Sequence, residues 1–226
     1  MLYKDDFFNV TGIPQVDLII TEPPHKIKSY RGDNIGDMAR FRQDIFTSPN
    51  DEIDIDMLEA CKLMYGLLKD GGTLIIFWDV WELGKLRDVL EQSQFTGFRW
   101  LVWKKNNPVP LNCNINYLSS SMEAFILCSK NSKSTFNQSY HNGLFEFNKV
   151  AKGSKKHMLE KPVPLLEALI EHNSNEGDIV LDPFMGAGST GEAAVKMRRE
   201  FIGIEIDDNY FKIAQQRLGS VSKALI

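Results

Sequence analysis

The sequence lacks the features that mark disulfide-rich, zinc-binding or membrane-spanning proteins. Its 226 residues include only three cysteines and four histidines. Cys61, Cys113 and Cys128 are dispersed and form no C-x-x-C pair, so we expect reduced thiols and no disulfide framework. The histidines show no metal-ligand spacing, so no structural metal is expected. No run approaches the ~18 to 20 consecutive apolar residues that a membrane span requires.

Signals for export and a strongly basic composition are missing as well. Residues 1–6 have neither the basic start nor the apolar core of a secretory signal, so a cytoplasmic protein is expected. The formal net charge of -4 gives no overall signature of a nucleic-acid binder. Basic residues do cluster at 149–157 and at Arg31, Arg40 and Arg42. Charge alone favours solvated loops there, and phosphate binding needs other support.

What the sequence does contain is an alternation of strand-like and helix-like segments. Apolar runs predict buried strands at 16–21, 73–78, 98–103, 124–128, 178–181 and 201–206. Helices are predicted at 54–68, closing at Gly71-Gly72, and at 81–92, 163–172 and 190–198. Such alternation predicts an α/β protein with a mostly parallel sheet covered on both faces. We expect a single domain over residues 1–226.

Irregular segments interrupt this pattern. Residues 26–52, 104–121 and 130–160 are too long for ordinary connections between strands and helices. Long loops within a compact domain are usually binding loops, lids or disordered parts. We therefore interpret loops 26–52 and 104–160 as candidate substrate-recognition elements.

The segment 178–191 contains the most informative motif. A predicted strand runs into Gly186-x-Gly188-x-x-Gly191, which opens a predicted helix, and Glu205 follows at the end of the next strand. Glycines allow a close backbone approach to a ligand, and a later carboxylate accepts hydrogen bonds from ribose hydroxyls. The pattern therefore predicts an adenosine-type cofactor site, with a purely structural glycine turn as the alternative.

Chain order indicates which cofactor this is. Too few residues follow Gly191 to build a complete dinucleotide fold, so the other strands must come from earlier sequence and the order is circularly rearranged. Asp182 would repel a pyrophosphate but could pair with the cationic end of S-adenosylmethionine. A nicotinamide-dependent oxidoreductase is the disfavoured alternative, because it rests on the glycine pattern alone.

Three segments carry a resemblance to a known family. D-P-F-M-G-A-G-S-T-G at 182–191 resembles the cofactor loop of amino-group DNA methyltransferases, and G-I-E-I-D at 203–207 is similar to a second motif of that family. The segment 157–162 resembles its H-P-T-Q-K-P motif but matches only at His157, Lys161 and Pro162. Since all three follow an x-P-P-x motif, the order resembles that of the β class.

The resemblance implies a Rossmann-like methyltransferase fold with a mostly parallel seven-stranded sheet, helices on both faces and a circularly permuted strand order. It also implies nine residues that bind S-adenosylmethionine. The methionine end would lie against Asp182, Phe184, Gly186 and Gly188. Ser189 and Thr190 would bind its carboxylate at the start of a helix. Glu205 would hold the ribose and Asp5 would lie near the adenine. Lys161 would assist the carboxylate, with a surface lysine at a helix entry as the alternative.

The x-P-P-x motif reads Glu22-Pro23-Pro24-His25, where the family has D/N/S-P-P-Y/W/F. By resemblance, the Glu22 side chain and the Pro23 carbonyl would accept the hydrogens of an exocyclic amine and make its nitrogen nucleophilic. The prolines, including Pro24, would fix the backbone. His25 would stack on a base flipped out of the duplex.

This motif also departs from the family pattern. Glutamate moves the carboxylate by about 1 Å or more relative to aspartate, and such a shift can cost on the order of 10²-fold in rate. Two hypotheses therefore stay open. The first is a DNA methyltransferase acting on adenine N6, with cytosine N4 as a lesser possibility. The second is a catalytically silent subunit that binds nucleic acid beside an active partner.

The remaining resemblance concerns partners. Residues 103–110 resemble a W-x-K-x-N-P-x-P region beside the target-base pocket of the family, although such a segment is also a common surface turn. We expect DNA as the substrate, with RNA still open, and a restriction-modification context. A homodimer, or a heterodimer with another methyltransferase subunit, would enlarge a short recognition region.

Overall fold

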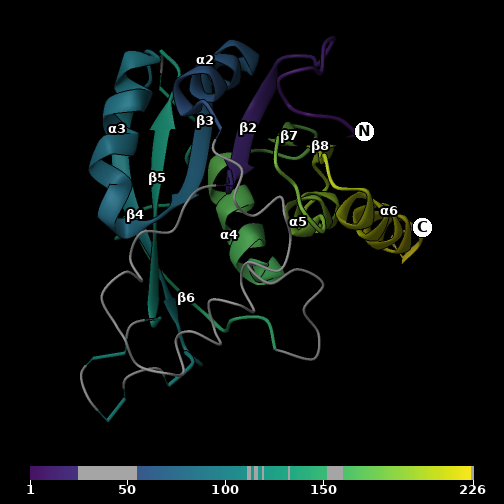
Figure 1. Cartoon of the computed structure of the whole chain (residues 1–226). Coiled ribbons are helices and arrows are strands. Elements are labelled where there is room, and N and C mark those ends of the chain that lie inside the picture. Colours follow the sequence, from purple (N-terminus) through teal and green to yellow (C-terminus); the bar gives the residue numbers. More distant parts are fainter. Residues whose placement is uncertain are drawn as a thin grey trace.

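A single sheet forms the centre of the molecule. The computed structural model describes residues 1–24, 55–110, 113–114, 117–118, 120–131, 133–151 and 160–224. Within them, eight strands lie in the order β1-β8-β7-β2-β3-β5-β4-β6 (Figure 1). They are β1 (Leu2–Tyr3), β2 (Val16–Thr21), β3 (Leu68–Trp78), β4 (Thr96–Lys105), β5 (Met122–Ser129), β6 (Leu144–Phe147), β7 (Ile179–Asp182) and β8 (Glu200–Ile204).

The sheet is mostly parallel, as predicted. Among the described residues the antiparallel pairings are β3 with β5 and β5 with β4, so β5 is the one reversed strand. The strand count is eight where the resemblance implied seven. β1 and β6 were not predicted. β1 has only two residues, and β6 lies within the segment 130–160 that was read as irregular.

Helices cover both faces of the sheet, which confirms the predicted layers. One face packs on α2 (Met57–Leu67) and α3 (Leu83–Gln92), and the other on α4 (Val163–Asn173), α5 (Ser189–Lys196) and α6 (Asp208–Ala224). Because side chains alternate along a strand, Ile19 of β2 joins Met64 and Leu90 in one core cluster, while its neighbour Leu18 joins Leu169 in the other. None of the described helices is long and apolar enough to span a membrane.

The arrangement of β2 and β7 explains why the motifs are far apart in the chain. These strands are parallel neighbours, with Leu18 opposite Val180 and Ile19 opposite Leu181. The x-P-P-x motif follows β2 and the glycine loop follows β7, so both motifs begin at the same edge of the sheet (Figure 1). Open α/β sheets bind their ligands at the carboxyl ends of the strands. We call this the carboxyl edge.

Several element boundaries differ from the prediction. The helix expected at 54–68 begins at Met57, because Asp56 caps it by accepting a hydrogen bond from the Glu59 N–H at 3.0 Å. Gly72 does not close this helix. It lies within β3, where an added Cβ would come within 2.9 Å of the Lys69 carbonyl oxygen, so the glycine permits a close backbone approach.

Other differences concern segments that were read as loops. α6 was not predicted as a helix, and the irregular segment 130–160 contains β6. The strand predicted at 124–128 is present as β5. The first loop expected to face the substrate, 26–52, lies outside the described residues. The roles of both regions in recognition therefore stay predictions.

Gly191 provides a test of how tightly α5 packs on the sheet. A Cβ at Gly191 would lie 2.5 Å from the Phe201 ring, whereas one at Gly219 in α6 would have no neighbour within 4 Å. We expect Gly191→Ala to lower the free energy of unfolding by about 1–3 kcal/mol through overpacking. The control Gly219→Ala should raise it by about 0.5–1 kcal/mol, because alanine favours a helix. Urea denaturation of both variants measures this, and equal effects would contradict the packing.

Candidate active site and cofactor loop

The glycine loop connects β7 to α5 through two residues in left-handed conformations. Gly186 has φ 51° and Gly188 has φ 78°, values that side chains disfavour. The Gly188 N–H donates to the Met185 carbonyl at 2.9 Å, which closes the turn. Gly188 is the N-cap of α5 and offers no side chain to it. The first N–H groups of α5 therefore lack a side-chain cap, and such a helix start favours an anion.

Asp182 joins three segments at the end of β7. Its carboxylate accepts hydrogen bonds from the Thr21 hydroxyl at 2.8 Å, the Thr190 hydroxyl at 2.7 Å and the Phe184 N–H at 3.2 Å. Burial raises the pKa of Asp182 to about 6, although these hydrogen bonds act to lower it. The carboxylate thus holds the end of β2, the glycine loop and the start of α5 together.

Glu205 follows β8 and holds the loop from the other side. Its carboxylate accepts from the Gly186 N–H at 2.9 Å and from the Asp207 N–H at 2.7 Å. Burial raises its pKa, against the effect of these hydrogen bonds. A carboxylate has about four lone-pair sites, so Glu205 retains acceptor capacity for hydroxyl groups.

The x-P-P-x motif continues directly from β2. Pro23 is buried and Glu22 is partly buried, while His25 lies outside the described residues. A hydrogen bond links this segment to the glycine loop. The link is the preceding residue, Thr21, whose hydroxyl donates to Asp182. The fold therefore brings the motif and the loop together, although 161 residues separate Thr21 from Asp182.

Lys161 contacts the x-P-P-x motif. Its ammonium donates to a Glu22 carboxylate oxygen at 2.5 Å and lies 3.1 Å from a Glu123 oxygen. Glu123 was not predicted as a site residue. One feature of the sequence could have indicated it, because Glu123 is a single carboxylate at the start of an otherwise apolar strand, in M-E-A-F-I-L-C. The predicted contact of Lys161 with a cofactor carboxylate stays a prediction.

Asp5 and Phe184 lie on the N-terminal side of the loop. Asp5 follows β1, which is parallel to β8, so it also lies at the carboxyl edge. Its carboxylate accepts from the Asp6 N–H at 2.7 Å. The Phe184 ring packs edge-on against buried Phe7, with 5.6 Å between the ring centroids. The segment after β1 therefore packs along the glycine loop.

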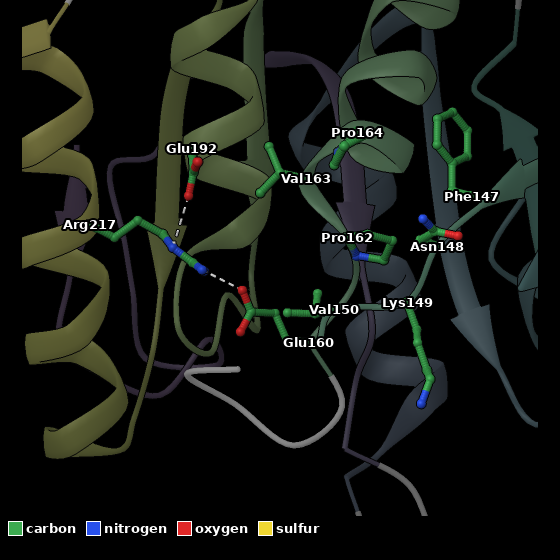
Figure 2. A pocket seen from close by; sticks show the side chains of 10 residues that line it. All are labelled: Phe147, Asn148, Lys149, Val150, Glu160, Pro162, Val163, Pro164, Glu192 and Arg217. Atoms are coloured by element: carbon green, nitrogen blue, oxygen red, sulfur yellow. Dashed lines mark hydrogen bonds and ion pairs between the residues drawn. The ribbon is translucent and has the colours of Figure 1, made fainter. Parts of the chain in front are cut away.

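A pocket of about 460 Å³ opens behind the loop, between the segment after β6 and helices α4, α5 and α6 (Figure 2). Figure 2 shows Arg217 pointing between two carboxylates, with Glu160 on one side and Glu192 on the other at 3.0 Å. The Arg217 guanidinium also donates to the Ala187 carbonyl at 3.0 Å. This cluster holds the backbone of the glycine loop at Ala187.

Comparison with known proteins agrees with this arrangement. A family model described as DNA methylase matches residues 16–216. The chain belongs to the DNA methylase family. Type II methyltransferase M2.DpnII of Streptococcus pneumoniae is 30% identical over 222 residues, covering 90% of this chain and 82% of the relative. Type II methyltransferase M2.MboI of Moraxella bovis is 28% identical over 97% of this chain and 86% of the relative.

Solved structures of DNA methylases have the same fold. The M1.HpyAVI complex with S-adenosylmethionine is 30% identical, with a TM-score of 0.74 over 96% of this chain and 98% of that one. The PvuII cytosine-N4-specific DNA methyltransferase gives a TM-score of 0.72 over 98% of this chain and 89% of that one. Its 16% identity shows the fold alone. The resemblance to amino-group DNA methyltransferases is therefore confirmed. This DNA methylase family depends on S-adenosylmethionine.

The carboxyl edge of this DNA methylase has the chemistry that S-adenosylmethionine requires. Glu205 offers acceptors for ribose hydroxyls, and the uncapped start of α5 offers N–H donors for a carboxylate. The left-handed glycines keep the backbone of the loop free of side chains. The residues present therefore fit the cofactor.

Asp182 gives a pH-dependent test of the loop. Its folded-state pKa of about 6 lies above the ordinary 3.8, so its contribution to stability is fully present below about pH 4 and is lost as the pH rises through about 6. Asp182→Asn removes this titration. The free energy of unfolding of the native protein, minus that of the variant, should therefore fall by ~2–3 kcal/mol between about pH 4 and pH 7. Urea denaturation across this range measures the difference, and a pH-independent value would contradict the buried carboxylate.

Proposed function

We propose that this DNA methylase transfers a methyl group from S-adenosylmethionine to the exocyclic N6 amine of adenine in DNA. Cytosine N4 is the second candidate acceptor. The observation that carries the proposal is the hydrogen bond from the Thr21 hydroxyl to the Asp182 carboxylate. It ties the strand that ends in the x-P-P-x motif to the strand that ends in the glycine loop. A group that accepts the amine hydrogens thus lies beside a group that holds the methyl donor.

Different residues hold the two substrates in this proposal. Glu205 binds the ribose hydroxyls, and the first turn of α5, with Ser189 and Thr190, binds the amino-acid carboxylate. The other predicted contacts come from Asp5, Asp182, Phe184, Gly186 and Gly188. Lys161 has two candidate partners, the cofactor carboxylate predicted from the resemblance and the Glu22 carboxylate that it contacts in the structure. S-adenosylmethionine supplies a methyl group on a positively charged sulfur. Because Thr190 and Asp182 are hydrogen-bonded to each other, their main contribution is to hold the loop in shape.

The acceptor amine is handled by the x-P-P-x motif. Glu22 accepts one amine hydrogen and the Pro23 carbonyl accepts the other, which localises the nitrogen lone pair that the aromatic ring otherwise delocalises. Pro23 and Pro24 restrict the backbone, so the carbonyl keeps its direction. His25 stacks on the flipped base. The contribution of the protein is alignment of the nitrogen with the methyl carbon.

DNA recognition is assigned to the loops at 26–52 and 104–160. Support comes from the position of described parts of the second region, since β4 ends and β5 begins at the carboxyl edge. The chain offers little further surface for recognition, so we propose that it acts as a dimer, either with itself or with another methyltransferase subunit. Its relatives named as Type II methyltransferases support a restriction-modification context.

One observation favours a second function. The Glu22 oxygen that accepts from Lys161 is already engaged, and the motif has glutamate and histidine where the family has other residues. A silent subunit that binds nucleic acid while a partner carries out the chemistry would tolerate both features. In that case the chain would gain activity when Glu22→Asp and His25→Tyr restore the family motif.

Methyl transfer to DNA by the purified chain tests the proposal. We expect tritium from labelled S-adenosylmethionine to enter mixed-sequence DNA, and nucleoside chromatography to identify N6-methyladenine. Glu22→Ala should lower the rate on the order of 10²-fold, because alanine has no side-chain acceptor for the amine hydrogen. Glu176 precedes β7 at the opposite edge of the sheet, so the control variant Glu176→Ala should leave the rate unchanged.

The products separate the alternatives. Detection of N4-methylcytosine instead of N6-methyladenine would mean that the acceptor is cytosine N4 and not adenine N6. No transfer by the chain alone, together with transfer after the double change Glu22→Asp and His25→Tyr, would support the silent subunit.

A further inference from the structure

Lys161 lies where four elements meet at the carboxyl edge. It precedes α4, and its ammonium reaches Glu22 after β2 at 2.5 Å and Glu123 at the start of β5 at 3.1 Å. Below it, the ring centroid of Phe77 in β3 lies 5.1 Å from the same nitrogen. The side chain of Lys161 is only 8% exposed, so these groups replace water around its charge.

A second lysine completes the arrangement. Lys105 at the end of β4 lies 2.6 Å from the other oxygen of Glu123, and 5.1 Å from the ring centroid of Trp103. The charges alternate along a chain of four side chains, Glu22, Lys161, Glu123 and Lys105. Two carboxylates and two ammonium groups balance, which is the condition under which buried charges are tolerated.

Both central groups stay charged in this network. Burial favours the neutral form of Lys161, but the attraction of Glu123 and Glu22 outweighs it and raises the pKa of the lysine. Burial likewise acts to raise the pKa of Glu123, but Lys161 and Lys105 lower it to about 2. The ion pair between Lys161 and Glu123 therefore persists at neutral pH.

This network restricts the position of Glu22, the glutamate at which the motif departs from the family pattern. Glutamate has one more rotatable bond than aspartate, so an unrestrained Glu22 carboxylate would sample many positions. A hydrogen bond to a buried ammonium that is itself held by Glu123 and Phe77 restricts it to one position.

We propose that Lys161 is a positioning residue, which fixes the Glu22 carboxylate for the acceptor amine through a buried ion pair anchored by Glu123 and Lys105. The catalytic part of this inference rests on the proposed function, whereas the ion pair itself does not. Under this inference Lys161 serves the acceptor amine. The competing role is a direct bond from Lys161 to the cofactor carboxylate.

Kinetics and cofactor binding separate the two roles. Lys161→Met keeps the length of the side chain and removes its charge. We expect it to lower kcat by about 10²-fold, as for a displaced catalytic group, with the Kd of S-adenosylmethionine unchanged in calorimetric titration. If Lys161 instead bound the cofactor, the Kd would rise by about tenfold or more, and the proposal would be overturned.

Lys69 provides the matched control. Its ammonium lies 2.8 Å from both oxygens of Asp17, and this ion pair is at the opposite edge of the sheet, where β2 begins. Lys69→Met removes the same charge from an ion pair far from the motif. We expect kcat and Kd of this variant to equal those of the native protein, and an equal loss of kcat in both variants would overturn the positioning role.

A thermal double-mutant cycle tests the ion pair without any activity. Glu22→Gln, Lys161→Met and the double variant are melted beside the native protein. If the two side chains interact, the double variant should melt well above the temperature that the sum of the two single shifts predicts. Additive shifts would overturn the proposal. If the native chain transfers no methyl group but the cycle shows coupling, the proposed function fails while the ion pair stands.

Discussion

The buried carboxylate of Asp182 accepts hydrogen bonds from Thr21, Thr190 and the Phe184 N–H, and the shape of the carboxyl edge depends on these three bonds. They fix the end of β2 relative to the loop after β7 and to the first turn of α5. Glu205 and Arg217 hold the same loop by its backbone from two further directions. The pairing of β2 with β7 places the x-P-P-x motif and the glycine loop at one edge, and Asp182 joins the ends of these two strands.

A second group of charges then acts on the motif itself. Lys161 contacts Glu22 from the entry to α4, and Glu123 holds Lys161 from β5. The two systems touch the motif at adjacent residues, since Thr21 bonds to Asp182 and Glu22 bonds to Lys161. The strand end is thus tied on one side to the loop that we propose to bind the methyl donor, and on the other to a partly buried ion network. Alignment of donor and acceptor, which limits methyl transfer, is the physical property that both systems serve.

Much of this could be predicted from the sequence where a motif has a local physical cause. Gly186, Gly188 and Glu205 were found because a glycine turn followed by a carboxylate has a fixed spacing. Their mutual contact, the Gly186 N–H to Glu205, is present in the structure. The layers followed from the alternation of apolar runs and helical segments. These inferences needed only residues that are close in the sequence.

What the sequence did not reveal depends on contacts between distant segments. Glu123 could not be identified from the sequence as a partner of Lys161. The two residues are 38 positions apart, and the packing of α4 determines whether they meet. β1 is too short to show alternation and β6 lies within a polar segment, and both strands pair with parallel neighbours that are distant in the sequence. Gly72 resembled a helix end, yet it belongs to β3 because β2 passes close to its backbone.

The most direct test of this account is a crystal structure of the chain with S-adenosylhomocysteine. The account predicts that the ribose hydroxyls contact Glu205, that the amino-acid carboxylate lies at the start of α5, and that Lys161 still bonds to Glu22. A nucleoside bound away from the carboxyl edge would contradict the assignment of the site. A Lys161 ammonium that has left Glu22 for the ligand carboxylate would contradict the positioning of the acceptor group.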